Sequence, residues 1–201
     1  MNLANKITLF RIILAPAFFV VYQLPGWIPS WFSNGAIWTV PVLWLIFIIS
    51  EITDLLDGIV ARKFNLTSDL GKLLDPFADT IMQITCFICF VMDGYLPAIL
   101  FLLVIYREFG VLLLRNLMMK KGIAMGASMT GKVKTVLYIV AAGFVLAAES
   151  ILRIRAAHNI FAIIYRYFVI GANILFGIAI IFSIVSFIEY CLVVKKSGKN
   201  D

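Results

Sequence analysis

Six apolar stretches separated by short polar links make up most of the chain. They cover residues 12–24, 37–52, 73–92, 98–119, 135–152 and 160–194. A membrane-spanning helix takes roughly 20 residues, so the pattern predicts six spans joined by short links. The more polar residues 2–11 predict an amphipathic helix that lies at the membrane surface. The expected fold class is all-α, a polytopic membrane protein of six transmembrane helices preceded by an N-terminal amphipathic interfacial helix.

The composition agrees with a membrane protein. Of the 201 residues, 63% are hydrophobic and only 14% are charged, whereas a soluble domain is about half apolar and about a quarter charged. Six spans with short loops leave no room for a separate soluble domain, so residues 1–201 are expected to form one integral-membrane domain. The net charge of +6 would suggest nucleic acid in a soluble protein, but here it indicates topology and contact with anionic lipids, with no nucleic-acid partner.

The basic residues predict the orientation of the chain. Most of the 17 lysines and arginines lie near the N-terminus, in the links after the second and fourth runs, and in the C-terminal tail. Because cytoplasmic loops are enriched in Lys and Arg, both termini are expected in the cytoplasm. Arg153, Arg155 and Arg166 fall on the other side, and topology does not explain them.

Aspartates are concentrated at one place in the chain, between residues 54 and 79. At 100° per residue, two groups of residues each share one side of a helix. The first group contains Asp54, Asp57, Gly58 and Ala61, and the second contains Gly71, Asp75 and Asp79. A short link makes the two helices antiparallel neighbours, and their small residues allow close approach. Four carboxylates are therefore expected in one pocket at the cytoplasmic edge of the membrane.

Four carboxylates together repel one another and need counter-charge. An oxygen-only ligand set without His or Cys suits Mg²⁺ or Mn²⁺, and two such ions bridged by carboxylates are a common device for phosphoryl chemistry. Arg62, Lys63 and Lys72 add anion-binding charge on the same side. The pocket is therefore predicted to be a metal-assisted site for a phosphate-containing substrate at the level of the lipid headgroups.

The segment reads Asp54-x2-Asp57-Gly58-x2-Ala61-Arg62-x8-Gly71-x3-Asp75-x3-Asp79. It resembles the signature of the CDP-alcohol phosphatidyltransferase family, with every signature position filled. Residues 5–11 with Pro16 resemble the N-terminal segment of bacterial members. Two further segments, Arg107-Glu108-x6-Arg115 and residues 131–135, resemble the branch of the family that uses sn-glycerol 3-phosphate as the acceptor.

The resemblance implies transfer of a phosphatidyl group from CDP-diacylglycerol to an alcohol, with release of CMP. It implies two divalent ions, Mg²⁺ or Mn²⁺, held by Asp54, Asp57, Asp75 and Asp79, with Asp79 also the catalytic base on the acceptor hydroxyl. The residues expected to bind CDP-diacylglycerol are Asn5, Thr8, Gly58, Ala61, Arg62, Ser68 and Gly71. The resemblance also implies a homodimer in the bacterial cytoplasmic membrane, with the active site facing the cytoplasm.

Four basic residues are candidates for binding the phosphate of an anionic acceptor: Arg107, Arg115, Lys132 and Lys134. Arg107 and Arg115 lie eight residues apart, about 80° around a helix, so both can face one cavity. Arginine at span depth without a functional partner is uncommon. For Arg107 and Arg115 the alternative is an ion pair with Glu108 or a neighbouring helix. For Lys132 and Lys134 it is simple positive-inside charge.

Other functions stay open at this point. The acceptor of the same enzyme class could be inositol phosphate, serine or a phosphatidyl lipid. A divalent-cation transporter also uses intramembrane carboxylates, but here the aspartates cluster at one face and Arg62, Arg107 and Arg115 would repel cations. A structural membrane scaffold gives no reason for the aspartate spacing.

Overall fold

The computed structural model describes residues 3–32, 36–63, 69–123, 126, 128–154 and 159–197. For residues 3–5, 55–63, 69–70, 72–73, 159 and 196–197 it describes the backbone alone. Over these ranges the chain is helical and contains no β-strand. The helices are α1 (Leu3–Trp27), the 3₁₀ helix η1 (Pro29–Phe32), α2 (Thr39–Lys63), α3 (Asp69–Met92), α4 (Ala98–Lys120), α5 (Met129–Arg153) and α6 (Asn159–Ser197). The predicted all-α class is confirmed.

Each long helix covers one predicted apolar run, but the boundaries differ where polar residues continue the helix. Helix α5 begins at Met129, well before the predicted Thr135, because the Ser128 hydroxyl caps it by accepting the Gly131 amide at 3.1 Å. At the other end of the chain, the predicted interfacial helix and the first apolar run form one continuous helix, α1. Residues 3–11 are therefore not a separate element in the structure.

Four helices of the described part are long and apolar enough to cross a membrane: Lys6–Trp27, Leu74–Met92, Met129–Arg153 and Ile160–Lys195. Helix α4 does not qualify, since Arg107, Glu108 and Arg115 interrupt its apolar surface. Helix α2 carries Glu51 and Asp54 towards its C-terminal half. Length and composition thus support a membrane protein, while the count of six spans stays a prediction.

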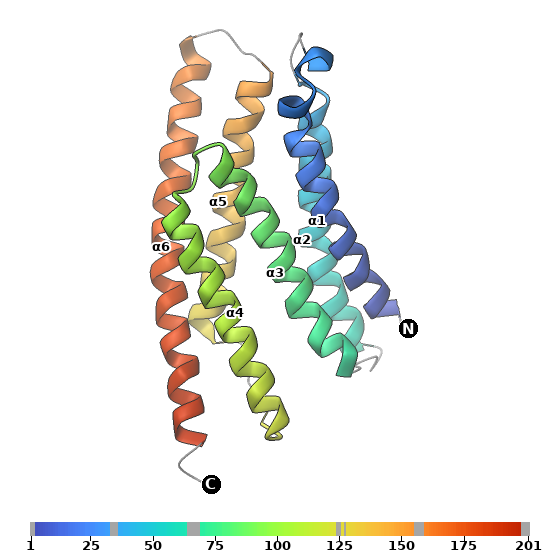
Figure 1. Cartoon of the computed structure of the whole chain (residues 1–201), viewed down its shortest axis with the longest axis vertical. Helices are drawn as coiled ribbons and strands as arrows, with labels where there is room; N and C mark the ends of the chain where they lie inside the picture. The colour runs from blue at the N-terminus through green and yellow to red at the C-terminus, as the bar shows by residue number, and fades with distance from the viewer. Residues whose placement is uncertain are drawn as a thin grey trace.

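The helices form two groups of three that run alternately up and down (Figure 1). In the first group, α1 packs along both α2 and α3, which contact each other over a much shorter stretch. In the second group, α6 packs along α5 and α4. Gly110 of α4 permits that approach, because a Cβ there would meet the Phe187 ring at 2.8 Å. This division into two groups matters because the candidate site lies between them.

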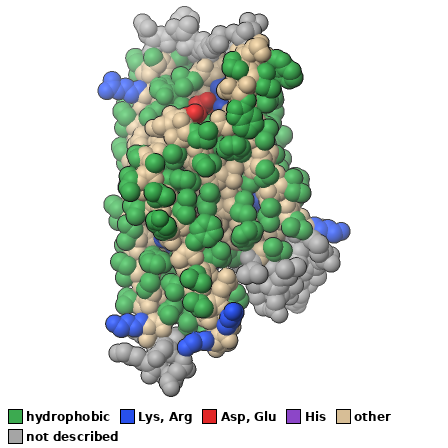
Figure 2. All heavy atoms as spheres, viewed as in Figure 1, with side chains coloured by type: hydrophobic (Ala, Val, Ile, Leu, Met, Phe, Trp, Pro, Cys, Tyr) green, Lys and Arg blue, Asp and Glu red, His purple; other side chains and the backbone are tan. Residues whose placement is uncertain are grey.

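Aromatic side chains join the two groups in the core. Phe87 of α3 is 1% exposed and packs edge-on against Tyr138 of α5 and Phe176 of α6, with ring centroids 5.2 and 5.1 Å apart. Such edge-to-face pairs add about 0.5–1.5 kcal/mol beyond the burial of their area. The face shown in Figure 2 is apolar over most of its height, and its few Lys and Arg side chains lie mainly at its edges and lower end.

A second buried feature, at the end of α5, explains Arg153. Its guanidinium donates to Glu149 Oε1 at 2.8 Å, to Thr39 Oγ1 at 2.8 Å and to the Tyr22 carbonyl at 2.9 Å. Its Cζ also lies 4.8 Å from the centre of the Tyr22 ring. Arg153 therefore ties α5 to α1 and to the start of α2, which is a packing role that charge topology could not reveal. Arg166 is exposed on α6, and Arg155 lies outside the described residues.

The link between α3 and α4 completes this cluster. Tyr95 donates its hydroxyl hydrogen to Glu149 Oε2 at 2.9 Å. Burial, together with the nearby Glu149 carboxylate, raises the pKa of the Tyr95 phenol. The phenol consequently stays protonated and remains a hydrogen-bond donor. Both carboxylate oxygens of Glu149 are thus satisfied.

Candidate active site

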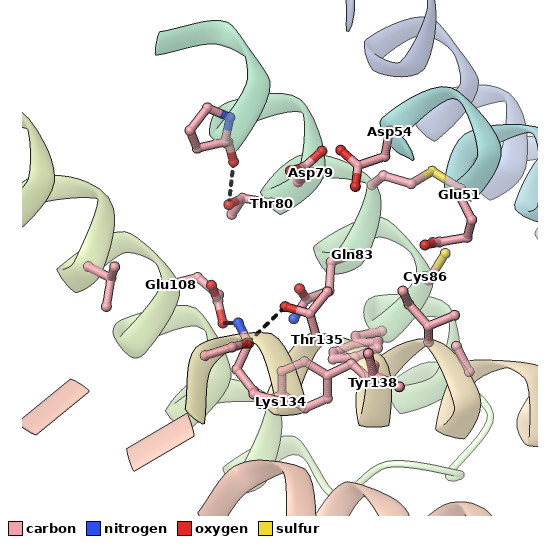
Figure 3. Close-up of a pocket in the computed structure, with 18 of the residues that line it drawn as sticks. Glu51, Asp54, Asp79, Thr80, Gln83, Cys86, Glu108, Lys134, Thr135 and Tyr138 are labelled. Carbon is pink, nitrogen blue, oxygen red and sulfur yellow. Dashed lines mark hydrogen bonds and ion pairs between the residues drawn. The ribbon is translucent and has the colours of Figure 1, made fainter. Parts of the chain in front are cut away.

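A cavity of about 670 Å³ opens between the two helix groups. Its wall on the first group includes Arg11, Asp54 and Asp79, and its wall on the second includes Arg107 and Lys134. Phe87 and Tyr138 also line it. Figure 3 shows Asp54 and Asp79 close together, with Glu108 and Lys134 projecting from the other helix group. The cavity therefore places acidic and basic side chains around one space.

Asp54 of α2 and Asp79 of α3 converge on a single cationic atom. Arg11 Nη1 donates to Asp54 Oδ1 at 2.8 Å and also to Asp79 Oδ1. The two carboxylate side chains are 48% and 47% exposed, whereas the Arg11 side chain is 1% exposed. The predicted meeting of the aspartate-bearing helices is thus observed for this pair, with an arginine from α1 between them.

Asp75 lies one turn before Asp79 on α3 and has a different partner. Its Oδ1 accepts the Thr8 hydroxyl hydrogen at 2.7 Å. Thr8 and Arg11 are three residues apart and so share one face of α1. The aspartate spacing predicted two helices that face each other directly, but α1 forms a third wall of the pocket.

Most of the other signature positions can be placed only by their backbone. Helix α2 contains Asp57, Gly58, Ala61 and Arg62, and α1 contains Asn5, but the side chains at these positions lie outside the described residues. Ser68 lies outside them altogether. Gly71 is buried in the first turn of α3.

The donor set fits a divalent cation in its chemistry. Two carboxylate oxygens from different helices already point at one positive group, the Arg11 guanidinium, which lies where a metal cation between them would lie. Within the described part of the chain, no group of three His, Cys, Asp or Glu side chains stands in the geometry of a metal centre. The side chain of Asp57 lies outside that described part. Among the four carboxylates predicted to hold metal, Asp54 and Asp79 are the described pair that converges on one point.

The basic wall of the cavity is organised by Glu108. Its carboxylate accepts from Arg107 Nη1 at 2.9 Å and from Lys134 Nζ at 2.5 Å. Arg107 also donates to Ser186 Oγ at 2.8 Å and to the Ser183 carbonyl at 3.3 Å. Both cations are buried yet line the cavity. The ion pair of Arg107 with Glu108, which was the alternative to acceptor binding, is present. Together with Lys134, it leaves two positive charges against one negative charge at this wall.

Arg115 joins the same wall through α6. Its Nη2 donates to the Tyr190 hydroxyl oxygen at 2.5 Å, and that hydroxyl donates to the Gly126 carbonyl at 3.1 Å. The Ser128 amide also donates to the Tyr190 hydroxyl, at 3.3 Å. Both Arg115 and Tyr190 line the cavity. Arg107 and Arg115 therefore face one cavity, as their spacing predicted.

The two candidate lysines differ sharply in environment. Lys134 is 4% exposed, whereas Lys132 is an exposed residue at the cavity wall. Both lie within α5 rather than before it. Gly131 beside them is tightly surrounded, because a Cβ there would lie 3.1 Å from Ser128 Oγ and 3.2 Å from Ser186 Oγ.

Sequence reasoning missed three residues of this site. Arg11 resembles ordinary positive-inside charge, although its spacing from Thr8 on one helix face could have indicated a shared role. Tyr190 and Ser186 carry no recognisable signal, because α6 reads as a continuous apolar run. Their place at the site follows from the packing of α6 against α4 and α5.

The sequence model of the CDP-alcohol phosphatidyltransferase family matches residues 1–185. The chain belongs to this family. It is 37% identical over 153 residues to a CDP-diacylglycerol–glycerol-3-phosphate 3-phosphatidyltransferase of Treponema pallidum (strain Nichols), a match that covers 75% of this chain and 71% of the relative. It is 35% identical over 200 residues to the enzyme of the same name from Bacillus subtilis (strain 168), covering 94% of this chain and 93% of that relative.

A third member of the family is a probable phosphatidylglycerophosphate synthase of Mycobacterium tuberculosis (strain ATCC 25618 / H37Rv). It is 35% identical over 156 residues, which cover 77% of this chain and 71% of that protein. The family resemblance identified from the aspartate signature is therefore confirmed.

Proposed function

We propose that this protein transfers the phosphatidyl group of CDP-diacylglycerol to sn-glycerol 3-phosphate, giving phosphatidylglycerophosphate and CMP. The observation that carries this proposal is the single cavity walled by Asp54 and Asp79 on one helix group and by Arg107, Arg115 and Lys134 on the other. The similar proteins from Treponema pallidum and Bacillus subtilis bear the name of this activity.

The acidic wall is the proposed donor side. Asp54, Asp57, Asp75 and Asp79 would hold two divalent cations, Mg²⁺ or Mn²⁺. Bound there, such ions would neutralise the diphosphate and the departing CMP. The contacts to CDP-diacylglycerol expected from Asn5, Thr8, Gly58, Ala61, Arg62, Ser68 and Gly71 are part of the same proposal.

The basic wall is the proposed acceptor side. A glycerol 3-phosphate dianion is attracted by Arg107, Arg115 and Lys134, which exceed Glu108 in charge at this wall. Exposed Lys132 adds attraction at longer range. Binding of the acceptor phosphate there would direct its hydroxyl across the cavity, towards Asp79.

The proposed reaction is one displacement. The acceptor hydroxyl oxygen forms a bond to the phosphorus of the phosphatidyl group, the bond from that phosphorus to the CMP oxygen breaks, and the hydroxyl proton passes to Asp79. Each of these roles needs the two helix groups to face each other across the cavity.

The orientation in the membrane belongs to the same proposal. Six spans, both termini in the cytoplasm, a cytoplasmic site and a homodimer are supported by the distribution of basic residues and by the family. The start of α1 and the end of α6 lie towards the same end of the bundle (Figure 1), which agrees with an even number of spans. Labelling of single cysteines at Lys121 and Trp31 from each side of a vesicle tests the topology.

The decisive experiment is an acceptor comparison with purified protein in detergent. CMP release from CDP-diacylglycerol should require Mg²⁺ or Mn²⁺ and sn-glycerol 3-phosphate. Release only with serine, inositol phosphate or a phosphatidyl lipid would keep the enzyme class and overturn the proposed acceptor. Metal flux into proteoliposomes without CMP release would favour a cation transporter instead.

A further inference from the structure

Arg11 stands out at the acidic wall because it is buried while the two carboxylates that it binds are not. The arginine is 1% exposed, while the two carboxylates that it binds are about half exposed and face the cavity. Both carboxylates accept from the same nitrogen, Nη1. A cation from inside the helix packing thus reaches outwards to a pair of acids from α2 and α3.

The charges explain why a cation is needed there. Two carboxylates that converge on one point repel each other strongly unless a positive charge lies between them. The guanidinium provides that charge and hydrogen bonds to both helices. Charge-assisted hydrogen bonds of this kind are roughly twice as strong as neutral ones.

The oxygens involved are the important detail. Asp54 Oδ1 and Asp79 Oδ1 both point at Arg11, and a divalent cation held between these carboxylates would draw on the same oxygen lone pairs. A guanidinium and a metal ion cannot occupy one point between two carboxylates. Arg11 and the metal are therefore competitors.

We infer that Arg11 is a built-in counter-cation that holds the aspartate pair in the metal-free protein and is displaced when a divalent cation binds. This inference rests on the proposed function, in which these aspartates are metal ligands. It assigns Arg11 a positioning role: it keeps Asp54 and Asp79 side by side until metal arrives. It also makes the measured metal affinity weaker than the intrinsic affinity of the carboxylates, since each binding event releases the arginine first.

The test is a titration of substrate-free protein with Mn²⁺. The electron paramagnetic resonance signal of free Mn²⁺ reports how much of the metal is bound. Arg11→Met removes the competing charge and keeps an unbranched apolar side chain. Its dissociation constant for Mn²⁺ should fall by about ten-fold or more, given that a hydrogen bond to a charged group contributes about one to two factors of ten. Arg11→Lys keeps a cation without the planar fork and should lie between the two.

Lys6→Met is the matched control. Lys6 lies on the same helix and is exposed, so this variant loses one positive charge from α1 without touching the aspartate pair. Its affinity for Mn²⁺ should equal that of the wild-type protein. An equal gain in Lys6→Met and Arg11→Met would make the effect one of general charge and would overturn the role of Arg11.

Thermal unfolding supplies a second readout. In EDTA, Arg11→Met should unfold at a lower temperature than wild type, because the two carboxylates repel without a counter-ion. Saturating Mn²⁺ should remove that difference. A loss of stability that is the same in EDTA and in Mn²⁺ would mean that Arg11 is only a structural pin between helices and would overturn the inference.

The metal site and the competition by Arg11 fail in different ways. If wild type, Arg11→Met and Arg11→Lys all leave Mn²⁺ free in solution, the metal site itself is wrong. If wild type binds Mn²⁺ and Arg11→Met and Arg11→Lys bind it no tighter, the aspartates remain a metal site and only the competition by Arg11 is wrong.

Discussion

Arg11 and Arg153 are both buried arginines that connect α1 to other helices, and they differ in what surrounds their partners. Arg11 binds two carboxylates that are about half exposed and line a cavity. Arg153 binds Glu149, whose side chain is 12% exposed, and its remaining nitrogens donate to Thr39 and to the Tyr22 carbonyl. Arg153 does not line the cavity.

The difference teaches how to separate a functional ion pair from a structural one. Around Arg153, the guanidinium and both carboxylate oxygens of Glu149 find their hydrogen-bond partners within the protein, and neither residue lines the cavity. Around Arg11, the acids keep access to the cavity, and a second cation can reach them. Burial of the arginine alone would not have told the two sites apart.

The largest expected effect comes from removing an acid, and it should differ between Asp79 beside Arg11 and Glu149 beside Arg153. Asp79→Asn should lower the rate of CMP release by about 10²–10⁴-fold, since removal of a general base costs a factor of that order. Its unfolding midpoint should change little, because Asp79 is half exposed and Asp54 still pairs with the buried Arg11. Glu149→Gln should do the reverse, with lower stability and normal turnover per folded molecule. An active Asp79→Asn enzyme would contradict the assignment of the base.

A second comparison concerns the structural arginine. Arg153→Met leaves the Glu149 carboxylate buried without its cation and should lower the free energy of unfolding by about 3–5 kcal/mol. Mn²⁺ should not restore the loss, in contrast to Arg11→Met. Arg166→Met is the control, because Arg166 is exposed on α6. Denaturant titration in detergent measures all three proteins, and recovery of Arg153→Met by Mn²⁺ would erase the distinction between the two regions.

The basic wall offers a pair of lysines two residues apart. Lys134→Gln should raise the KM for glycerol 3-phosphate by about ten-fold or more, as expected for loss of a charged hydrogen bond. Lys132→Gln should raise it much less, because an exposed charge is screened by water and salt. Steady-state kinetics with varied acceptor and fixed CDP-diacylglycerol separates them. Equal effects would show that burial of Lys134 is irrelevant to the acceptor.

The smallest expected effect comes from Tyr95, which borders the cluster of Arg153 and Glu149. Tyr95→Phe removes the hydrogen bond to Glu149 Oε2 and should lower the free energy of unfolding by about 1.5 kcal/mol, the lower end of the range for a hydrogen bond to a charged group, with no change in turnover. Tyr167→Phe is the control, since Tyr167 is 71% exposed. A change in turnover for Tyr95→Phe would mean that the Arg153 cluster and the active-site cavity are coupled rather than independent.

Much of the fold could be predicted from hydrophobic runs, because lipid demands long apolar helices and the links between them are short. The aspartate spacing likewise led to the family, since the intervals between the signature residues place most of them on one face of each of two helices. Helix boundaries were less accessible. The start of α5 depends on the Ser128 cap rather than on hydropathy.

What sequence could not provide was the set of contacts between distant helices. Arg153 seemed to contradict the topology until its partners on α1 and α2 were visible. The carboxylate partners of Arg11 could not be read from the sequence, because they lie 43 and 68 positions away. Tyr190 needed the packing of α6 to bring its hydroxyl to Arg115.

The position of Arg11 on the first helix also has a consequence for biogenesis. A ribosome delivers α1 before α2 and α3, so the cation exists before either carboxylate is synthesised. An acidic helix added afterwards can pair with a cation that has already been synthesised, and such pairing would lower the penalty of bringing a carboxylate to span depth. The order of the chain thus places the counter-cation ahead of the two acids that it binds.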